Sequence, residues 1–293
     1  MTELSADDGT TIPASKGRGS FSSNSLKLYW EASSPENSIA SVVLVHGIGE
    51  HCGRYANLVE ALNANGIAVY GFDQRGHGRS QGMPSHVDAW QDYINDLRAF
   101  VDFVQGLEGD QPVFVLGHSM GALIALDFAI QYPNKINGLI INGIPLRPGS
   151  VARPHLILLA KLISLVKPTH LMNLGIDVDG LSSDAAVVKA YEADPLVQKK
   201  VSVRWGVSIL GAIERLRGAA QSLDVPVLMT HGRLDIINLP SGTTELFAMV
   251  KVRDKSIQLY EHSRHEVHND VDQAQFGADV SDWILPRTKP LGV

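Results

Sequence analysis

Short apolar runs recur along the chain, and each is bounded by glycine, proline or polar residues. Runs of this length are typical of strands that are buried on both faces of a sheet. We expect such strands at residues 42–45, 67–72, 113–116, 136–142, 225–230 and 257–260. Apolar residues at helical spacing indicate intervening and terminal helices, at residues 55–62, 94–104, 122–131 and 270–283. This alternation predicts an α/β fold, with a mostly parallel central sheet flanked by helices.

One long segment interrupts the alternation. Residues 145–223 contain few strand-like runs but several apolar helical stretches, among them residues 156–166. We interpret this segment as a mostly helical cap, or lid, inserted over the carboxyl edge of the sheet. The core would then comprise residues 24–144 and 224–293. Residues 1–23 are polar and rich in serine, threonine and glycine, and we expect them to form a flexible tail.

Composition and charge narrow the class of protein. The 293 residues suit one large domain, or one domain with an insertion. The net charge is −6 and no long Lys/Arg cluster occurs, which argues against nucleic-acid binding. No apolar run reaches the ~20 residues that span a bilayer. The polar first residues lack a basic stretch followed by an apolar run, so we do not expect them to act as a secretory signal. The single cysteine, Cys52, cannot form an intramolecular disulfide, which is compatible with a cytoplasmic location.

One pentapeptide points to nucleophilic catalysis, and it reads Gly117-His118-Ser119-Met120-Gly121. It lies between a predicted buried strand and an Ala/Leu-rich predicted helix, the context that a nucleophile elbow of the α/β-hydrolase fold requires. The sharp turn lifts the Ser119 hydroxyl above the sheet edge, and the glycines avoid clashes with neighbouring backbone. We therefore predict Ser119 as the nucleophile.

A serine hydroxyl needs a base, and the base needs a carboxylate to orient it. In this fold the acid and then the histidine follow the serine along the chain. Asp235 lies in the loop after the predicted strand 225–230, at the carboxyl edge of the sheet where Ser119 lies. Asp224 and Asp254 precede strands and would lie at the opposite edge. Asp235 is therefore the predicted acid.

Three histidines follow the last predicted strand and compete as the base: His262, His265 and His268. Residue chemistry alone does not choose among them. His262 is very near the strand end, and His268 approaches the final helix. Their positions favour His265.

The oxyanion of the tetrahedral intermediate needs backbone donors. One is expected from Met120, the residue after the nucleophile, and the other from the loop 46–49, where Ile48 is the best candidate. Histidines 46, 51, 77 and 118 show no recurring ligand spacing, so we expect no metal. Ester hydrolysis by these groups needs no cofactor.

Several motifs together resemble those of the monoacylglycerol lipases, in the monoacylglycerol lipase / lysophospholipase-like family of serine α/β-hydrolases. They lie in the oxyanion loop, a Gly-rich loop, the elbow, the cap and the catalytic-histidine segment, at residues 43–55, 73–80, 117–121, 191–197 and 259–266. The resemblance spans residues 26–283. Cys52 is atypical of the family, and Ala122 stands where a third glycine is frequent.

The resemblance implies that Asp235 is the acid and His265 the base. It also implies that Glu50, Arg54 and His268 line a pocket for the glycerol head group, although Glu50 and Arg54 could instead form a structural ion pair. The implied activity is hydrolysis of a monoacylglycerol through an acyl-enzyme on Ser119.

Other substrates and partners stay open at this point. The resemblance is also compatible with a lysophospholipase, a general carboxylesterase, an acyltransferase, or a catalytically inactive ligand-binding protein on the same fold. The apolar cap segment either packs on the core or contacts a membrane or micelle surface, so the chain could be peripheral to a membrane. The sequence does not indicate an oligomeric state.

Overall fold

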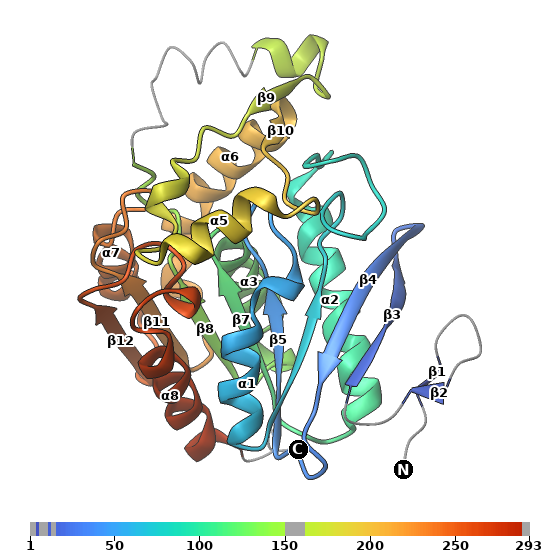
Figure 1. Ribbon diagram of the computed structural model, residues 1–293, viewed down its shortest axis with the longest axis vertical. Helices are drawn as coiled ribbons and strands as arrows, with labels where there is room; N and C mark the ends of the chain where they lie inside the picture. Colours follow the sequence, from blue (N-terminus) through green and yellow to red (C-terminus); the bar gives the residue numbers. More distant parts are fainter. Residues whose placement is uncertain (1–3, 6–10, 13–15, 150–161, 289–293) are drawn as a thin grey trace.

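The computed structural model describes residues 4–5, 11–12, 16–149 and 162–288, and its largest element is an eight-stranded sheet (Figure 1). The strand order is β12-β11-β8-β7-β5-β6-β4-β3. The bounds are β3 (Lys16–Ser23), β4 (Leu26–Ser33), β5 (Ala40–Val45), β6 (Ile67–Phe72), β7 (Val113–His118), β8 (Gly138–Asn142), β11 (Val227–Gly232) and β12 (Lys255–Tyr260). The strands from β12 to β6 pair in parallel, which confirms the predicted α/β-hydrolase class.

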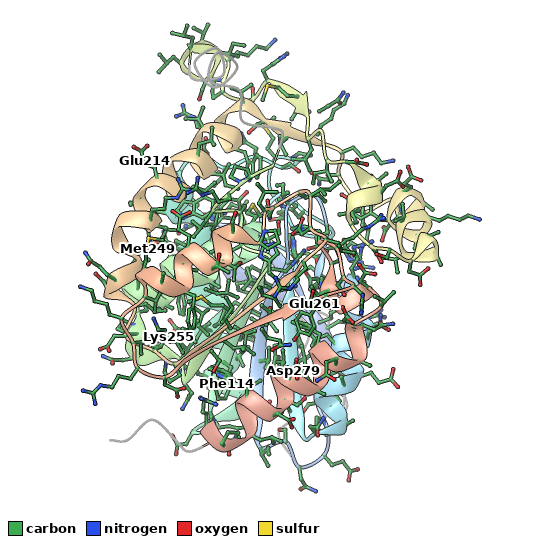
Figure 2. All side chains as sticks on the ribbon, turned by 90° about the vertical axis from the view of Figure 1, so that its left-hand side faces the viewer. Phe114, Glu214, Met249, Lys255, Glu261 and Asp279 are labelled. Carbon is green, nitrogen blue, oxygen red and sulfur yellow. The ribbon has the colours of Figure 1, made fainter. Side chains whose placement is uncertain are left out.

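The sheet separates two apolar layers. Along β5, Val43 and Val45 face one layer, whereas Val42 and Leu44 face the other, as the alternation of side chains along a strand requires. Side chains fill both layers, and Phe114 of β7 is among the fully buried ones (Figure 2).

Helices cover both faces of the sheet. Helices α1 (Ala56–Ala64) and α8 (Gln273–Ile284) pack against each other on one face. The other layer is built with α2 (Trp90–Glu108), α3 (Met120–Gln131), α6 (Val203–Ala219) and α7 (Ser241–Met249). No helix in the described part of the chain combines the length and hydropathy needed to cross a bilayer.

The expected N-terminal tail is wrong for residues 16–23. They form β3, which pairs antiparallel with β4 at the edge of the main sheet, from Lys16↔Ser33 to Ser23↔Leu26. The physical reason is Phe21, which is buried and lies 4.9 Å from Phe100 of α2 between ring centroids. Earlier in the chain, β1 (Leu4–Ser5) and β2 (Thr11–Ile12) form a separate antiparallel pair.

Residues 145–223 lie between β8 and β11, and their described part holds helices and one small two-stranded antiparallel sheet. The elements are β9 (Leu171–Asn173), η3 (Val178–Gly180), α5 (Ala185–Ala193), β10 (Lys200–Ser202), α6 and η4 (Ala220–Ser222), and residues 162–166 are also helical. Residues 150–161, which include most of the predicted helix 156–166, lie outside the described residues. Figure 1 shows α5, β9, β10 and α6 beyond the edge of the sheet to which β5 and β7 point.

Candidate active site

Ser119 occupies the junction between β7 and α3. Its φ is 53° and its ψ −118°, a left-handed conformation that side chains rarely adopt. A Cβ on Gly117 would lie 2.3 Å from the carbonyl oxygen of Gly121, and a Cβ on Gly121 would lie 2.0 Å from that of Val45. The strained turn therefore depends on glycine at both flanking positions.

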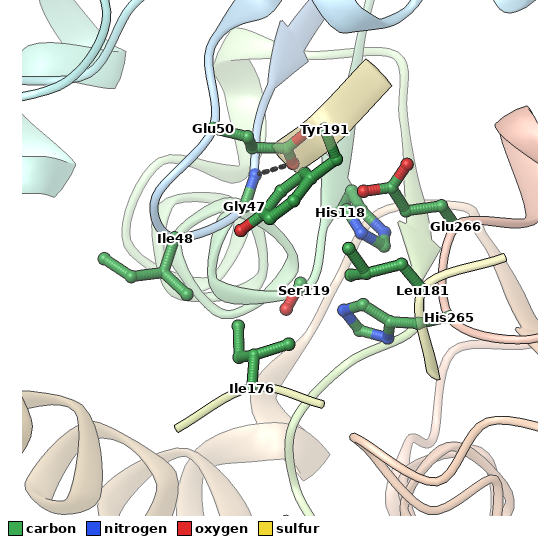
Figure 3. Close-up of a pocket in the computed structure, with 10 residues that line it drawn as sticks. All are labelled: Gly47, Ile48, Glu50, His118, Ser119, Ile176, Leu181, Tyr191, His265 and Glu266. Carbon is green, nitrogen blue, oxygen red and sulfur yellow. Dashed lines mark hydrogen bonds between the residues drawn. The ribbon is translucent and has the colours of Figure 1, made fainter. Parts of the chain in front are cut away.

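The Ser119 hydroxyl opens onto a pocket at the carboxyl edge of the sheet (Figure 3). The turn is held by the Ser119 N–H, which donates to the Asn142 carbonyl oxygen at 2.9 Å. Ile48, from the loop after β5, lines the same pocket, and Met120 is the first residue of α3. The first N–H groups of a helix have no partner within the helix, so the start of α3 favours negative charge beside Ser119.

The structure brings Asp235 and His265 together from the loops that follow β11 and β12. The distance from His265 Nδ1 to Asp235 Oδ2 is 2.7 Å, and both side chains are buried. Burial would raise the pKa of Asp235, but contacts with His265 and His231 hold this pKa well below its usual range. Burial likewise lowers the pKa of His265, but the charge of Asp235 and its hydrogen bond more than reverse this and raise it.

The three competing histidines have different surroundings. His265 contacts Asp235 and lines the pocket together with Ser119. His262 is exposed. His268 is buried and stacks on Tyr55 at 4.2 Å between centroids, and its ring nitrogens have no hydrogen-bond partner among the described residues. Of the three histidines, His265 therefore has the position expected of a base that Asp235 orients.

The predicted head-group residues lie in a buried polar cluster. The Arg54 guanidinium contacts Glu266 at 2.6 Å and Glu50 at 3.4 Å, and it lies over the Tyr191 ring at 4.7 Å. Glu50, Tyr191 and Glu266 line the pocket, and Figure 3 shows the hydrogen bond from Gly47 N to Glu50. Burial raises the pKa of Glu50, as does the nearby Glu266, against the effect of Arg54.

Sequence reasoning missed several polar residues at this site. Glu266 follows His265 directly, and nothing in the sequence distinguishes it from a solvent-exposed charged residue of a loop. His231 lies in β11, and its contact with Asp235 depends on the loop that follows the strand, which no spacing in the sequence specifies. Asn238, whose Nδ2 lies 3.4 Å from Ser119 Oγ, gave no signal in the sequence.

Other groups have structural roles. Cys52 is buried, and burial raises the pKa of its thiol well above the usual value, as expected for a packed residue. Across the ranges that the structure describes, no group of three or more His, Cys, Asp or Glu side chains is arranged to hold a metal ion.

Comparisons with known proteins show the family of the chain. A family model described as serine aminopeptidase, S33, matches residues 36–272. A monoacylglycerol lipase of Mycolicibacterium smegmatis is 32% identical over 245 residues, which cover 83% of this chain and 87% of the relative. The crystal structure of Paleococcus ferrophilus monoacylglycerol lipase has a TM-score of 0.82 at 32% identity, covering 89% of this chain and 99% of that one. A soluble variant of monoglyceride lipase from Saccharomyces cerevisiae, solved with a substrate analog, has a TM-score of 0.83 at 26% identity, covering 96% and 97%.

Proposed function

This chain belongs to the serine aminopeptidase S33 family of α/β-hydrolases, among its monoacylglycerol lipase-like members, and we propose that it cleaves monoacylglycerols into a fatty acid and glycerol. It is a carboxylic ester hydrolase. The observation that carries the proposal is one arrangement: Ser119, on a strained strand-to-helix turn, shares a pocket with His265, whose Nδ1 lies 2.7 Å from Asp235.

The acylation step follows from this arrangement. Ser119 Oγ attacks the ester carbonyl carbon while His265 Nε2 takes the hydroxyl proton, and Asp235 stabilises the imidazolium. The N–H groups of Ile48 and Met120 stabilise the oxyanion. When the intermediate collapses, the bond to the alcohol oxygen breaks, and His265 returns its proton to the departing glycerol.

Deacylation reverses these roles with water. His265 takes a proton from water, the resulting hydroxide attacks the acyl carbon, and Ser119 Oγ leaves with the proton from His265. The released product is the fatty acid. No group beyond the chain's own residues is required for either step.

The two ends of the pocket fit the two ends of a monoacylglycerol. Glu50 and Glu266 offer carboxylate oxygens that can accept hydrogen bonds from glycerol hydroxyls, and Arg54 orients Glu266. Ile48 of the core, with Ile176 and Leu181 of the segment 145–223, gives the pocket an apolar lining, against which an acyl chain would lie. His268 lies behind this lining, in ring contact with His118 and Tyr55, so its contribution to the head-group pocket would be indirect.

The segment 145–223 would act as the cap that delivers the substrate. Its described residues include Leu162, Leu165 and Val166, which are 56%, 79% and 88% exposed. Exposed apolar side chains on one short helix are suited to contact with a membrane or micelle surface, where single-chain lipids reside. This contact would be peripheral.

A hydrolysis panel tests the proposal. The wild-type enzyme is offered mono-, di- and triacylglycerols, lysophosphatidylcholine and a short-chain p-nitrophenyl ester, and we expect the highest kcat/KM with a monoacylglycerol. Ser119→Ala should lose turnover and labelling by a fluorophosphonate probe while keeping its circular dichroism spectrum. Ser281→Ala, which removes a buried hydroxyl from α8, should keep both.

Each outcome of the panel has a clear meaning. An enzyme that hydrolyses lysophosphatidylcholine or the p-nitrophenyl ester but ignores monoacylglycerols would overturn the substrate and leave a general lipid esterase. A wild-type protein that neither turns over any ester nor reacts with the probe would overturn the catalytic assignment and favour a ligand-binding protein.

A further inference from the structure

Asp235 contacts two imidazoles. His265 Nδ1 and His231 Nε2 lie 2.7 and 2.9 Å from the same oxygen, Oδ2. The other oxygen, Oδ1, accepts the backbone N–H groups of Ile237 and Asn238 at 2.8 and 2.9 Å. A carboxylate offers about four lone-pair sites, and here all of them have partners.

The partners of His231 fix its tautomer. Its Nε2 faces two acceptors, the Asp235 carboxylate and the Asn238 carbonyl oxygen at 2.9 Å, so Nε2 carries the hydrogen. Its Nδ1 lies 2.6 Å from Thr243 Oγ1 of α7, whose hydroxyl donates to it. The His231 side chain is fully buried, and so is Thr243. An imidazole with both ring nitrogens hydrogen-bonded is therefore built into the sheet beside the acid.

This arrangement determines where Asp235 can present its oxygen. The two backbone donors hold Oδ1 on one side, and His231 holds Oδ2 from the β11 side. Rotation of the carboxylate would break several buried hydrogen bonds at once and leave buried donors without a partner, which is unfavourable. Asp235 Oδ2 is thus held in one position as the acceptor for His265. This orients the His265 ring with Nδ1–H toward Asp235 and Nε2 toward Ser119.

We propose that His231 is a positioning residue, which locks the Asp235 carboxylate so that His265 keeps the orientation and tautomer needed to deprotonate Ser119. The inference rests on the proposed function. His231 lies on β11 and does not line the pocket, so it acts through Asp235 rather than on the substrate.

The test compares two replacements of His231. Leu removes the donor and keeps an apolar side chain, whereas Gln keeps an N–H donor that can reach Asp235. With the short-chain p-nitrophenyl ester, we expect His231→Leu to lower kcat by about 10- to 100-fold, the range of losses from small misplacements of catalytic groups. KM should change by less than about twofold, since His231 does not touch substrate. His231→Gln should restore most of kcat.

The pH profile separates positioning from a general structural effect. A looser contact with Asp235 supports the His265 imidazolium less, so the acid limb of kcat/KM should move to lower pH in His231→Leu but not in His231→Gln. Other ionisable groups near His265 are Glu50, Glu266, His118 and His268, and they are unchanged in both variants. The control is Thr230→Val, one position earlier on β11, which removes a buried hydroxyl that bonds to Ile141 and Asn142 and should leave the acid limb in place.

A second variant covers the case in which His231→Leu does not fold. Thr243→Val removes the hydroxyl that fixes the His231 tautomer, and it should lower kcat in the same direction but less. The inference is overturned if folded His231→Leu keeps wild-type kcat and acid limb, or if Thr243→Val does so where His231→Leu is unfolded. A wild-type protein without ester turnover or probe labelling would instead refute the proposed function.

Discussion

Arg54 donates from one guanidinium nitrogen to both carboxylate oxygens of Glu266, at 2.8 and 2.6 Å, with both side chains buried. Glu50 lies on the other side of the same guanidinium, with Oε2 3.4 Å from Nε, and this oxygen has no hydrogen bond to any described residue. One cation therefore faces two buried carboxylates at the end of the pocket. The cluster carries one excess negative charge when both carboxylates are ionised.

Removal of the shared cation should destabilise the fold strongly. Arg54→Met leaves two buried carboxylates without their counter-ion, and breaking a buried pair in this way costs about 3–5 kcal/mol. Urea unfolding at pH 7 measures the free energy of unfolding. The matched control is Arg233→Met, which breaks the exposed ion pair with Glu261 and should cost less than about 1 kcal/mol.

The loss in Arg54→Met should also depend on pH. Burial and Glu266 raise the pKa of Glu50 in the folded state. Between the unfolded value of about 4.3 and this raised value, the folded state binds more protons than the unfolded state. Stability therefore falls as pH rises through that window. Without Arg54 the pKa of Glu50 rises further, so the deficit should shrink when unfolding is repeated near pH 5; a deficit of equal size at both pH values contradicts the expectation.

The excess negative charge should select the head group. An anionic head would meet Glu50 and Glu266 at close range, and like charges brought together cost several kcal/mol. We expect kcat/KM for 1-oleoyl lysophosphatidic acid to be at least about tenfold below that for 1-oleoylglycerol. Glu266→Gln should reduce the difference in kcat/KM between the two lipids. Glu261→Gln, which removes an exposed charge, should leave this difference unchanged. Equal rates for the two lipids in the wild-type enzyme would show that the carboxylates do not face the head group.

The acid limb of activity should report His265. This residue must be neutral to accept the Ser119 proton, and Asp235 raises its pKa above the usual value of about 6.5 despite burial. The kcat/KM for a soluble ester should therefore fall as pH drops, with a midpoint above pH 6.5. Asp235→Asn should lower kcat by about 10⁴-fold, because the His265 ring then adopts the wrong tautomer. A midpoint well below 6.5 in the wild-type enzyme would mean that Asp235 does not support the imidazolium.

Patterns with strong local causes were readable from the sequence. The parallel strands are continuous apolar runs. The Ser119 elbow is indicated by two glycines, which are required because the neighbouring backbone leaves no room for a Cβ. The edge strand β3 could not be predicted in the same way, because its glycines and serines are typical of a loop. Its single apolar residue, Phe21, packs on Phe100, a contact that becomes visible only in the folded structure. Glu266 and His231 were missed for a related reason, since their roles arise from contacts with Arg54 and Asp235 that no local pattern specifies.

The elbow glycines offer a matched pair of substitutions. Gly121→Ala would place a Cβ 2.0 Å from the Val45 carbonyl oxygen, so backbone must shift beside Ser119. We expect this variant to unfold at a lower temperature. At temperatures where it is still folded, its ester turnover should nevertheless be below that of the wild-type enzyme. Gly106→Ala, in the exposed interior of α2 with no atom within 4 Å of the new Cβ, should instead stabilise the protein by about 0.5–1 kcal/mol. Thermal unfolding and ester turnover measure both; an active, stable Gly121→Ala protein would contradict the described turn.

Surface contact by the cap should affect lipid substrates selectively. The double variant Leu165→Glu/Val166→Glu places two charges on side chains that are 79% and 88% exposed, so folding should be little affected. Charges oppose insertion among lipids, so co-sedimentation with phosphatidylcholine vesicles and turnover of vesicle-borne monoacylglycerol should both fall. The ratio of that turnover to hydrolysis of a water-soluble ester isolates the effect from the chemical step. Ile39→Glu, a half-exposed residue just before β5 at the opposite edge of the sheet, should leave the ratio unchanged. If both variants keep the wild-type ratio, the exposed apolar residues of the cap serve no lipid surface, and substrate must reach Ser119 from solution.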